Sequence, residues 1–245
     1  GGEGSGDTLE APTYLSVKDS KLDEPGTWYA LHARDLVVDM ALGTYALNWR
    51  DNGGDGPAVI SSSGTLSGIE VLSDTRGNDI LRGSDFTPLS GSGRIVGETF
   101  QLGQGVDHVD GRGGVDTITV GAYLTSSITF DGVAIDVAAG TMRGLDGAVD
   151  TFANIERFSM TQGADVFKGD KNDNWVIGFG GGDTLSGGKG FDVLDYANSV
   201  SDGSGVTISG AQNIATGDTW SETYAGFEQI RGTRDDDRMR GGNGN

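Results

Sequence analysis

Side chains that carry oxygen recur every nine residues through the middle of this chain. Residues 160–195 divide without a gap into four units, MTQGADVFK, GDKNDNWVI, GFGGGDTLS and GGKGFDVLD. The sixth position of each unit holds a carboxylate or an amide, in Asp165, Asn174, Asp183 and Asp192. The eighth position holds an apolar side chain, in Phe167, Val176, Leu185 and Leu194. This spacing does not match a helical period, so it predicts a turn followed by a short strand in each unit.

These units have the composition of a site for a hard cation. Glycines at positions one, two and four permit the positive φ angles of tight turns. A tight turn exposes carbonyl oxygens, and the sixth-position carboxylate adds an anionic oxygen, so the ligands that Ca²⁺ prefers converge. Two units complete one coil, which places Asp165 and Asp183 on one edge and Asn174 and Asp192 on the other. A cation between stacked turns would take oxygens from both.

The same register occurs upstream, in LGQGVDHVD and GRGGVDTIT at residues 102–119. Their sixth positions are Asp107 and Asp116, which fall on opposite edges of one coil, so each needs a partner from a neighbouring coil. Fourth positions are expected to offer carbonyl oxygens, and among the glycines there we single out Gly105, Gly181 and Gly190.

A longer repeat contains these units. An apolar residue and a glutamate are followed nine residues later by an aspartate in three places, Ile69 and Glu70 with Asp79, Ile155 and Glu156 with Asp165, and Phe227 and Glu228 with Asp237. Strands are predicted upstream at LVVDMALG, VAIDVAAG and, more weakly, GVTISGA. We expect each copy to be a strand, a variable loop, an apolar-Glu strand and then nonapeptide turns. The three glutamates share one structural place, which suits a metal ligand or a partner of backbone donors better than acid-base chemistry.

One copy cannot bury its hydrophobic face alone, so the copies are expected to stack into one continuous solenoid. Within it we distinguish a degenerate unit at residues 1–10 and a cap or insertion at residues 11–34, which includes an edge strand around residues 13–17. The first copy, at residues 35–101, has variable loops and ends in a Gly/Ser-rich connection at 84–101. Residues 102–195 hold the nonapeptide blocks with the second copy, and residues 196–245 hold the truncated third copy. The chain begins without Met and ends inside a unit, so we expect it to be cut from a longer protein.

The charge of the chain indicates a need for cations. The formal net charge is -19, hydrophobic residues make up 35%, and 44 residues are glycine. Repulsion of this size opposes compaction unless bound cations neutralise it. It also disfavours nucleic acids and anionic membrane surfaces as partners. The chain has no cysteine, which excludes disulfides and thiolate sites, and no apolar run approaches membrane-spanning length, so no membrane insertion is expected.

The nonapeptides match the pattern G-G-x-G-x-D-x-U-x, so the chain resembles the RTX (repeats-in-toxin, haemolysin-type calcium-binding) family. The resemblance implies an all-β fold, a right-handed parallel β-roll or β-solenoid, with Ca²⁺ bound along its edges and export through a type I channel. On this interpretation the side-chain ligands are Asp107, Asp116, Asp165, Asp183 and Asp192, followed by Asp79, Asp237 and Asn174. Carbonyl ligands are expected from Gly105, Gly181 and Gly190.

The sequence contains no constellation typical of an enzyme, so we expect no catalysis. It lacks HExxH, GxSxG and a phosphate-binding loop. His108 occupies a seventh position, which should face solvent, and His32 lies in an aromatic cluster with Trp28, Tyr29 and Arg34 that suits either a sugar or a small core of its own. The variable loops hold Trp49 beside Arg50 and Trp220 near Tyr224, which are the best remaining candidates for ligand contact, although solenoid ends and loops also need aromatic plugs.

Two functions remain open. The first is a calcium-loaded extracellular module with a structural or secretion-folding role in a secreted or cell-surface protein of the adhesin or surface-layer type. The second is the non-catalytic C-terminal part of a secreted carbohydrate-active enzyme, lipase or protease, with glycan binding through the aromatic loops. In both cases the expected partner is calcium, with an extracellular glycan or neighbouring copies of the same protein as further candidates.

Overall fold

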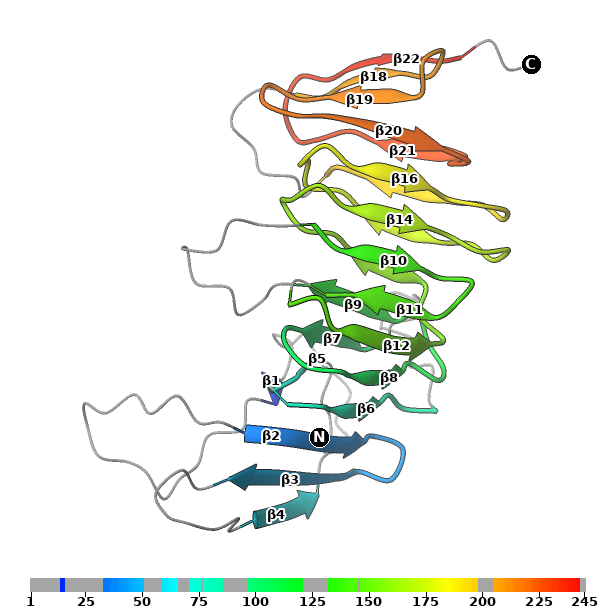
Figure 1. The fold of residues 1–245 in the computed structure, drawn as a ribbon. Coiled ribbons are helices and arrows are strands. Elements are labelled where there is room, and N and C mark those ends of the chain that lie inside the picture. The colour runs from blue at the N-terminus through cyan, green and yellow to red at the C-terminus, as the bar shows by residue number, and fades with distance from the viewer. Residues whose placement is uncertain are drawn as a thin grey trace.

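Every regular element of the described chain is a β-strand. The computed structural model describes residues 14–15, 33–50, 59–65, 71–75, 77–85, 97–120, 132–144, 146–197 and 205–242. The strands form two sheets that run along a column (Figure 1). The predicted all-β class is therefore confirmed.

Sheet A contains eight of the described strands and is parallel throughout. In spatial order its strands are β1 (Tyr14–Leu15), β5 (Val71–Ser73), β7 (Thr99–Leu102), β9 (Thr117–Val120), β13 (Arg157–Ser159), β15 (Trp175–Ile177), β17 (Val193–Asp195) and β21 (Gln229–Arg231). The predicted edge strand near the N-terminus is β1, at one end of this sheet.

Sheet B contains fourteen of the described strands. In spatial order these are β22 (Arg238–Arg240), β18 (Thr207–Ser209), β19 (Ile214–Thr216), β20 (Ser221–Ala225), β16 (Thr184–Ser186), β14 (Val166–Lys168), β10 (Ala134–Asp136), β11 (Thr141–Arg143), β12 (Val149–Ala153), β8 (His108–Asp110), β6 (Ile80–Arg82), β2 (Ala33–Asp39), β3 (Thr44–Arg50) and β4 (Val59–Thr65). Its order departs from the order of the sequence, because each copy inserts a block of strands that runs backwards along the column.

The chain alternates between the sheets wherever the nonapeptide units follow one another. From β5 to β9 and from β13 to β17, each strand is followed by one of the opposite sheet and pairs in parallel with the strand one coil away. This is the architecture of a parallel β-roll. Two rows of turns result: the first edge leads from sheet A into sheet B, and the second edge leads from sheet B into sheet A.

Three antiparallel strands interrupt this alternation in each copy. In the second copy β10 pairs with β11 and β11 with β12 in antiparallel fashion, while β12 pairs in parallel with β8 and β10 with β14. The first and third copies have the same arrangement in β2–β3–β4 and β18–β19–β20. We call each such group a meander. The prediction of a variable loop between the first strand and the apolar-Glu pair is therefore wrong.

Two further expectations about strand positions need correction. The apolar-Glu pairs were predicted inside strands, but β13 begins at Arg157 and β21 at Gln229, so Glu156 and Glu228 lie in turns. Residues 84–101 were predicted to be a connection, but Thr99–Leu102 forms β7 and Phe100 is buried. In these places the alternation of apolar and polar residues extends over too few residues to predict where a strand begins and ends.

The core is a single row of inward side chains from each sheet. The eighth positions supply it, and Val109, Ile118, Phe167, Val176, Leu185 and Leu194 are all buried. In the middle of the column Phe158 lies between Phe152 and Phe167, with ring centroids 5.4 and 5.2 Å away. Met239 occupies the same position in β22 but is 49% exposed, because β22 is the last strand at that end of the described sheet B.

The aromatic contacts predict where the column is most sensitive to a cavity. Replacing Phe158, which is fully buried, in Phe158→Ala should lower the free energy of unfolding in calcium by about 3–5 kcal/mol. Denaturant unfolding followed by circular dichroism measures this loss. The matched control is Val166→Ala, because Val166 is half exposed on β14 and should change stability by less than about 1 kcal/mol. Equal losses in the two variants would contradict the assigned inward and outward faces.

Candidate functional site

On the first edge, each turn carboxylate accepts a hydrogen bond from the backbone of the coil before it. The N–H of Asp79 donates to Asp107 Oδ1 at 2.8 Å, and that of Asp165 donates to Asp183 Oδ1 at 2.8 Å. The N–H of Asp107 donates in turn to Asp150 Oδ1 at 2.9 Å. Units two apart therefore stack on the same edge, as the nine-residue spacing predicts.

The second edge repeats this pattern with glutamates among the acceptors. Asn174 N–H donates to Asp192 Oδ1 at 2.8 Å and Glu98 N–H to Asp116 Oδ1 at 2.6 Å. Two of the glutamates predicted to share one structural place accept in the same way. Glu156 Oε2 accepts from Asp116 N–H at 2.9 Å and Glu228 Oε2 from Asp192 N–H at 2.7 Å. Glu70 lies outside the described residues.

The glycines predicted to line the turns stand where successive turns approach most closely. Their φ angles are positive, at 124° for Gly105, 128° for Gly181 and 118° for Gly190. A Cβ atom on Gly105 or Gly181 would overlap the carbonyl oxygen of the glycine stacked beneath it, Gly77 or Gly163. Side chains are excluded here, so backbone oxygens of neighbouring coils lie close together.

Several buried carboxylates have one oxygen without a hydrogen-bond donor. Among the described residues these atoms are Asp74 Oδ1, Glu98 Oε2, Asp116 Oδ2, Asp183 Oδ2, Asp192 Oδ2 and Glu222 Oε2. Each of these residues is less than a tenth exposed. A buried charge without a partner is strongly unfavourable, and oxygen-rich sites of this kind suit Ca²⁺. The donor set therefore fits a row of bound calcium ions, with the unpartnered oxygens as ligands.

The protonation equilibria of these groups point the same way. Burial raises the pKa of Asp183 to about 9, that of Asp116 to about 8 and that of Asp107 to about 7. Neighbouring carboxylates raise these pKa values further, with Glu222 acting on Asp183 and Glu98 on Asp116. Without a cation, the folded turns favour protons at neutral pH over a set of close negative charges.

One cluster on the first edge gathers three carboxylates. Asp74, Asp79 and Asp107 each offer an oxygen within 4.8 Å of the others, and all three are buried. Asp74 Oδ2 accepts from Gly103 N–H at 2.6 Å, and burial raises the pKa of Asp74 to about 9. Sequence reasoning missed Asp74 because it stands at the first position of its unit, where the repeat has glycine.

The first turn of each copy differs from the turns that follow it. Asp165 Oδ1 accepts from Val133 N–H and the Thr161 hydroxyl at 2.7 and 2.8 Å, and Oδ2 accepts from Thr161 N–H at 2.8 Å. Asp79 has equivalent bonds from Leu36 and Thr75, and Asp237 accepts from Val206 and Thr233. Protein donors satisfy both oxygens of Asp79 and Asp165, so these turns depend less on a cation.

Two acids of the meanders also belong to the edge. Asp150 in β12 and Glu222 in β20 are 3% and 1% exposed, and both were missed by sequence reasoning. The signal was present, because each stands six residues before the glutamate of its copy, Glu156 or Glu228. The hydroxyl of Tyr196, fully buried after β17, donates to Glu222 Oε1.

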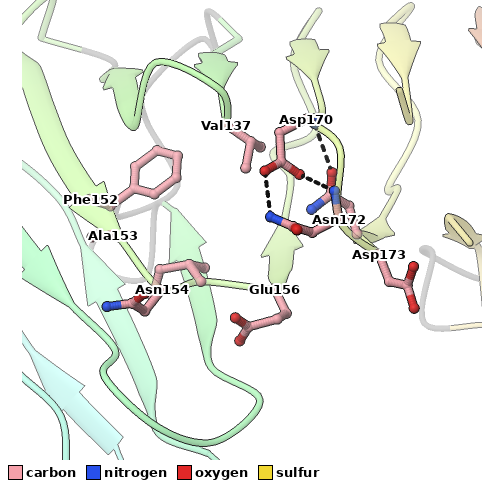
Figure 2. Close-up of a pocket in the computed structure, with 10 residues that line it drawn as sticks. Val137, Phe152, Ala153, Asn154, Glu156, Asp170, Asn172 and Asp173 are labelled. Carbon is pink, nitrogen blue, oxygen red and sulfur yellow. Dashed lines mark hydrogen bonds between the residues drawn. The ribbon is translucent and has the colours of Figure 1, made fainter. Parts of the chain in front are cut away.

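A hollow of about 190 Å³ opens on the second edge beside Asn174 (Figure 2). It lies between the short turn at Asn154–Glu156 and the nonapeptide turn that carries Asp170 and Asp173. Both oxygens of Asp170 accept hydrogen bonds from Asn172, at 2.9 and 2.7 Å. The Asp170 carboxylate is therefore already paired within its own turn.

The remaining predicted residues have varied positions. His108 is exposed on β8, with Nδ1 2.8 Å from Thr151 Oγ1, as expected of a seventh position. Trp220 is partly buried and stacks on Tyr196 with centroids 5.8 Å apart, and Tyr224 is buried, so both Trp220 and Tyr224 pack with the core. Trp49 and Arg50 lie on β3, but their side chains are outside the description, as are Trp28, Tyr29, His32 and the side chain of Arg34.

Comparison with protein families identifies the turns. The family described as the RTX calcium-binding nonapeptide repeat matches in four copies, over residues 65–85, 96–122, 161–194 and 222–245. A search of curated proteins found no match. Within the described residues, no helix is long and apolar enough to cross a membrane.

Protons should partly substitute for calcium. The raised pKa values of Asp116 and Asp183 mean that the folded state binds their protons more tightly than the unfolded chain does, since the ordinary pKa of an aspartate is 3.8. Their contribution in the absence of metal is thus most favourable below about pH 4 and is lost as pH rises toward 8–9. In calcium-free buffer the strand signal in circular dichroism should be larger at pH 5 than at pH 8. A signal that grows with pH would contradict this.

The threonine of the first turn should act independently of the metal. Thr161→Val keeps the shape but removes the hydroxyl that donates to Asp165 and accepts from Gly163 N–H at 2.9 Å. In calcium the free energy of unfolding should fall by about 1–3 kcal/mol while the number of bound calcium ions is unchanged. Denaturant unfolding and calorimetry measure the two quantities. Thr184→Val, at an exposed seventh position, is the control. Loss of a calcium ion in Thr161→Val would overturn this assignment.

Proposed function

From the RTX haemolysin-type calcium-binding nonapeptide repeats, which this chain carries in four copies, we propose that it is an extracellular module whose folding is driven by calcium. Its role is structural: it supplies a rigid column and couples export to folding in a larger secreted or cell-surface protein of the adhesin or surface-layer type. RTX repeats are typical of secreted proteins, which supports this location.

The observation that carries the proposal is the set of buried carboxylates with an unpartnered oxygen. They lie on both edges, on turns such as those of Asp116 and Asp192 on the second edge and Asp183 on the first. The net charge of -19 makes compaction without cations unfavourable. Divalent cations between the turns would remove the repulsion and supply the missing partners at the same time.

If folding requires calcium, the module folds only after it has left the cell. Extracellular calcium modules bind with dissociation constants of roughly 10⁻⁴–10⁻³ M, far above the free calcium of the cytosol. The chain would stay unfolded inside the cell, where it can pass a narrow exporter, and would fold outside. Because the complete site exists only in the folded chain, the free energy of metal binding becomes free energy of folding.

We propose a non-catalytic role. Support comes from the composition of the edges, where carboxylates pair with backbone N–H groups of the neighbouring coil, as Glu156 and Glu228 do. The exposed His108 contacts Thr151 and has no carboxylate among its described hydrogen-bond partners.

The central test is the response of the whole chain to calcium. In chelator at pH 7.5 (roughly physiological pH), circular dichroism should show a largely unordered chain, and millimolar CaCl₂ should produce a strand spectrum with a reduced radius of gyration in X-ray scattering. MgCl₂ at the same ionic strength is the control, because Mg²⁺ demands a smaller octahedral site and should be much less effective. Identical spectra in chelator and in calcium would disprove the proposal.

A further inference from the structure

A cation site of a different construction is indicated where a row of nonapeptide turns meets a meander. On the first edge the turn that ends in Asp183 has a nonapeptide turn on one side only. On its other side lies strand β20, in which Thr223 pairs with Thr184 and Tyr224 with Leu185. Thr223 N–H donates to the carbonyl oxygen of Asp183 at 2.9 Å. Glu222 therefore stands beside Asp183, in the register that the next sixth-position aspartate would occupy.

The two carboxylates are buried together and incompletely paired. Asp183 is 2% exposed and Glu222 is 1% exposed, and their side chains contact each other. Asp183 Oδ1 accepts from Asp165 N–H at 2.8 Å, but Asp183 Oδ2 and Glu222 Oε2 have no donor. Two adjacent buried anions are unstable without a positive partner, because both lose hydration and repel each other.

Tyr196 and Trp220 hold the glutamate in this position. The Tyr196 hydroxyl donates to Glu222 Oε1, which leaves Oε2 as the unpartnered oxygen. The Trp220 ring stacks on Tyr196 with an interplanar angle of 23° and lies against Gly180 and Gly217, where a Cβ atom would meet the indole. Tyr196 is thus a positioning residue, fixed by packing.

Backbone carbonyl oxygens of neighbouring strands and turns lie close to the turn that leads into Asp183. Gly180, Gly181 and Gly182 have consecutive positive φ angles of 82°, 128° and 96°, which bring the turn against its neighbours. A Cβ atom on Gly181 would lie 2.8 Å from the carbonyl oxygen of Gln162, and one on Gly182 would lie 3.7 Å from that of Ser221. Carbonyl groups from the preceding turn and from β20 therefore lie close to the glycines that lead into Asp183.

The other copies provide an internal comparison. In the second copy Asp150 has the place of Glu222: Thr151 pairs with His108, and Asp107 N–H donates to Asp150 Oδ1. In the first copy the residue six positions before Glu70 is Gly64, on β4. Strand β4 lies at the end of the described sheet B, with no turn stacked beyond it. The acid is present in the two meanders whose last strand pairs with a strand of a turn row, β8 or β16, and absent in the described meander whose last strand, β4, has no such partner.

We propose that Asp183 and Glu222 form a calcium site between a turn and a strand, in which Glu222 replaces the aspartate of a missing turn and Tyr196 orients it. The site closes the row of nonapeptide turns on the first edge. It rests on the proposed function, since it assumes that the preceding turns bind calcium, and it adds a ligand that lies outside the nonapeptide pattern.

The test is the number of calcium ions bound by the full chain, titrated with CaCl₂ alone in a calorimeter. Glu222→Gln preserves shape and an acceptor for Tyr196 and should bind one calcium ion fewer than the unmodified chain. Asp183→Asn should lose the same ion, and the double variant no more than either single one. Asp218→Asn, an exposed acid of the same meander, should bind the full number. Tyr196→Phe should keep the number but weaken one site about tenfold.

The outcomes separate the two proposals. A full complement of calcium in Glu222→Gln with unchanged affinity overturns the strand-and-turn site and leaves the proposed function intact. Absence of calcium binding by the unmodified chain refutes the proposed function itself. Should Glu222→Gln fail to fold, Tb³⁺ bound to the unmodified chain gives an independent readout, because Trp220 and Tyr196 adjoin the site. Trp220→Phe should then reduce tryptophan-sensitised Tb³⁺ emission, and unchanged emission overturns the site.

Discussion

The constraint on which this structure depends is the burial of many like charges along two narrow edges. Strands of three residues contribute only one inward apolar side chain each, so the core is thin and the turns form a large part of the molecule. Those turns bury carboxylates whose backbone partners satisfy one oxygen and leave the other without a donor. On the proposed function, the sheets form fully once cations occupy the edges, so the folded fraction should depend on the ions in solution.

The turns along each edge differ in how their aspartates are paired. The first turn of each copy uses a threonine, Thr75, Thr161 or Thr233, whose hydroxyl donates to the aspartate four residues later and accepts from the N–H two residues later. Such local bonds form without metal and are typical of threonine turns. The later nonapeptide turns have other residues in place of this threonine, such as Gly103, Arg112 and Phe179, and lack this donor. Each row therefore starts on a turn that the chain itself can close, and on the proposed function it continues through turns that an ion completes.

Much of the architecture could be predicted from the sequence, because the period of nine places each sixth and eighth residue without ambiguity. Asp183, Asp192 and the apolar rows follow directly from that period. The later strands of the meanders could not be predicted, since those of the second and third copies have only three to five residues and show little alternation. Glu222 and Asp150 were missed for the same reason: they belong to the edge only once β20 and β12 are known to pair with β16 and β8.

The number of strands in each meander has a consequence for how such a chain can change. Strands β10 and β12 both run opposite to β11 and hence point the same way, so the insertion leaves the polarity of sheet B intact. Inserting an even number of strands would present the next coil with a reversed template and move its acidic residue to the wrong side of the column. Viable rearrangements of this region must conserve parity, so strands should be gained or lost in pairs.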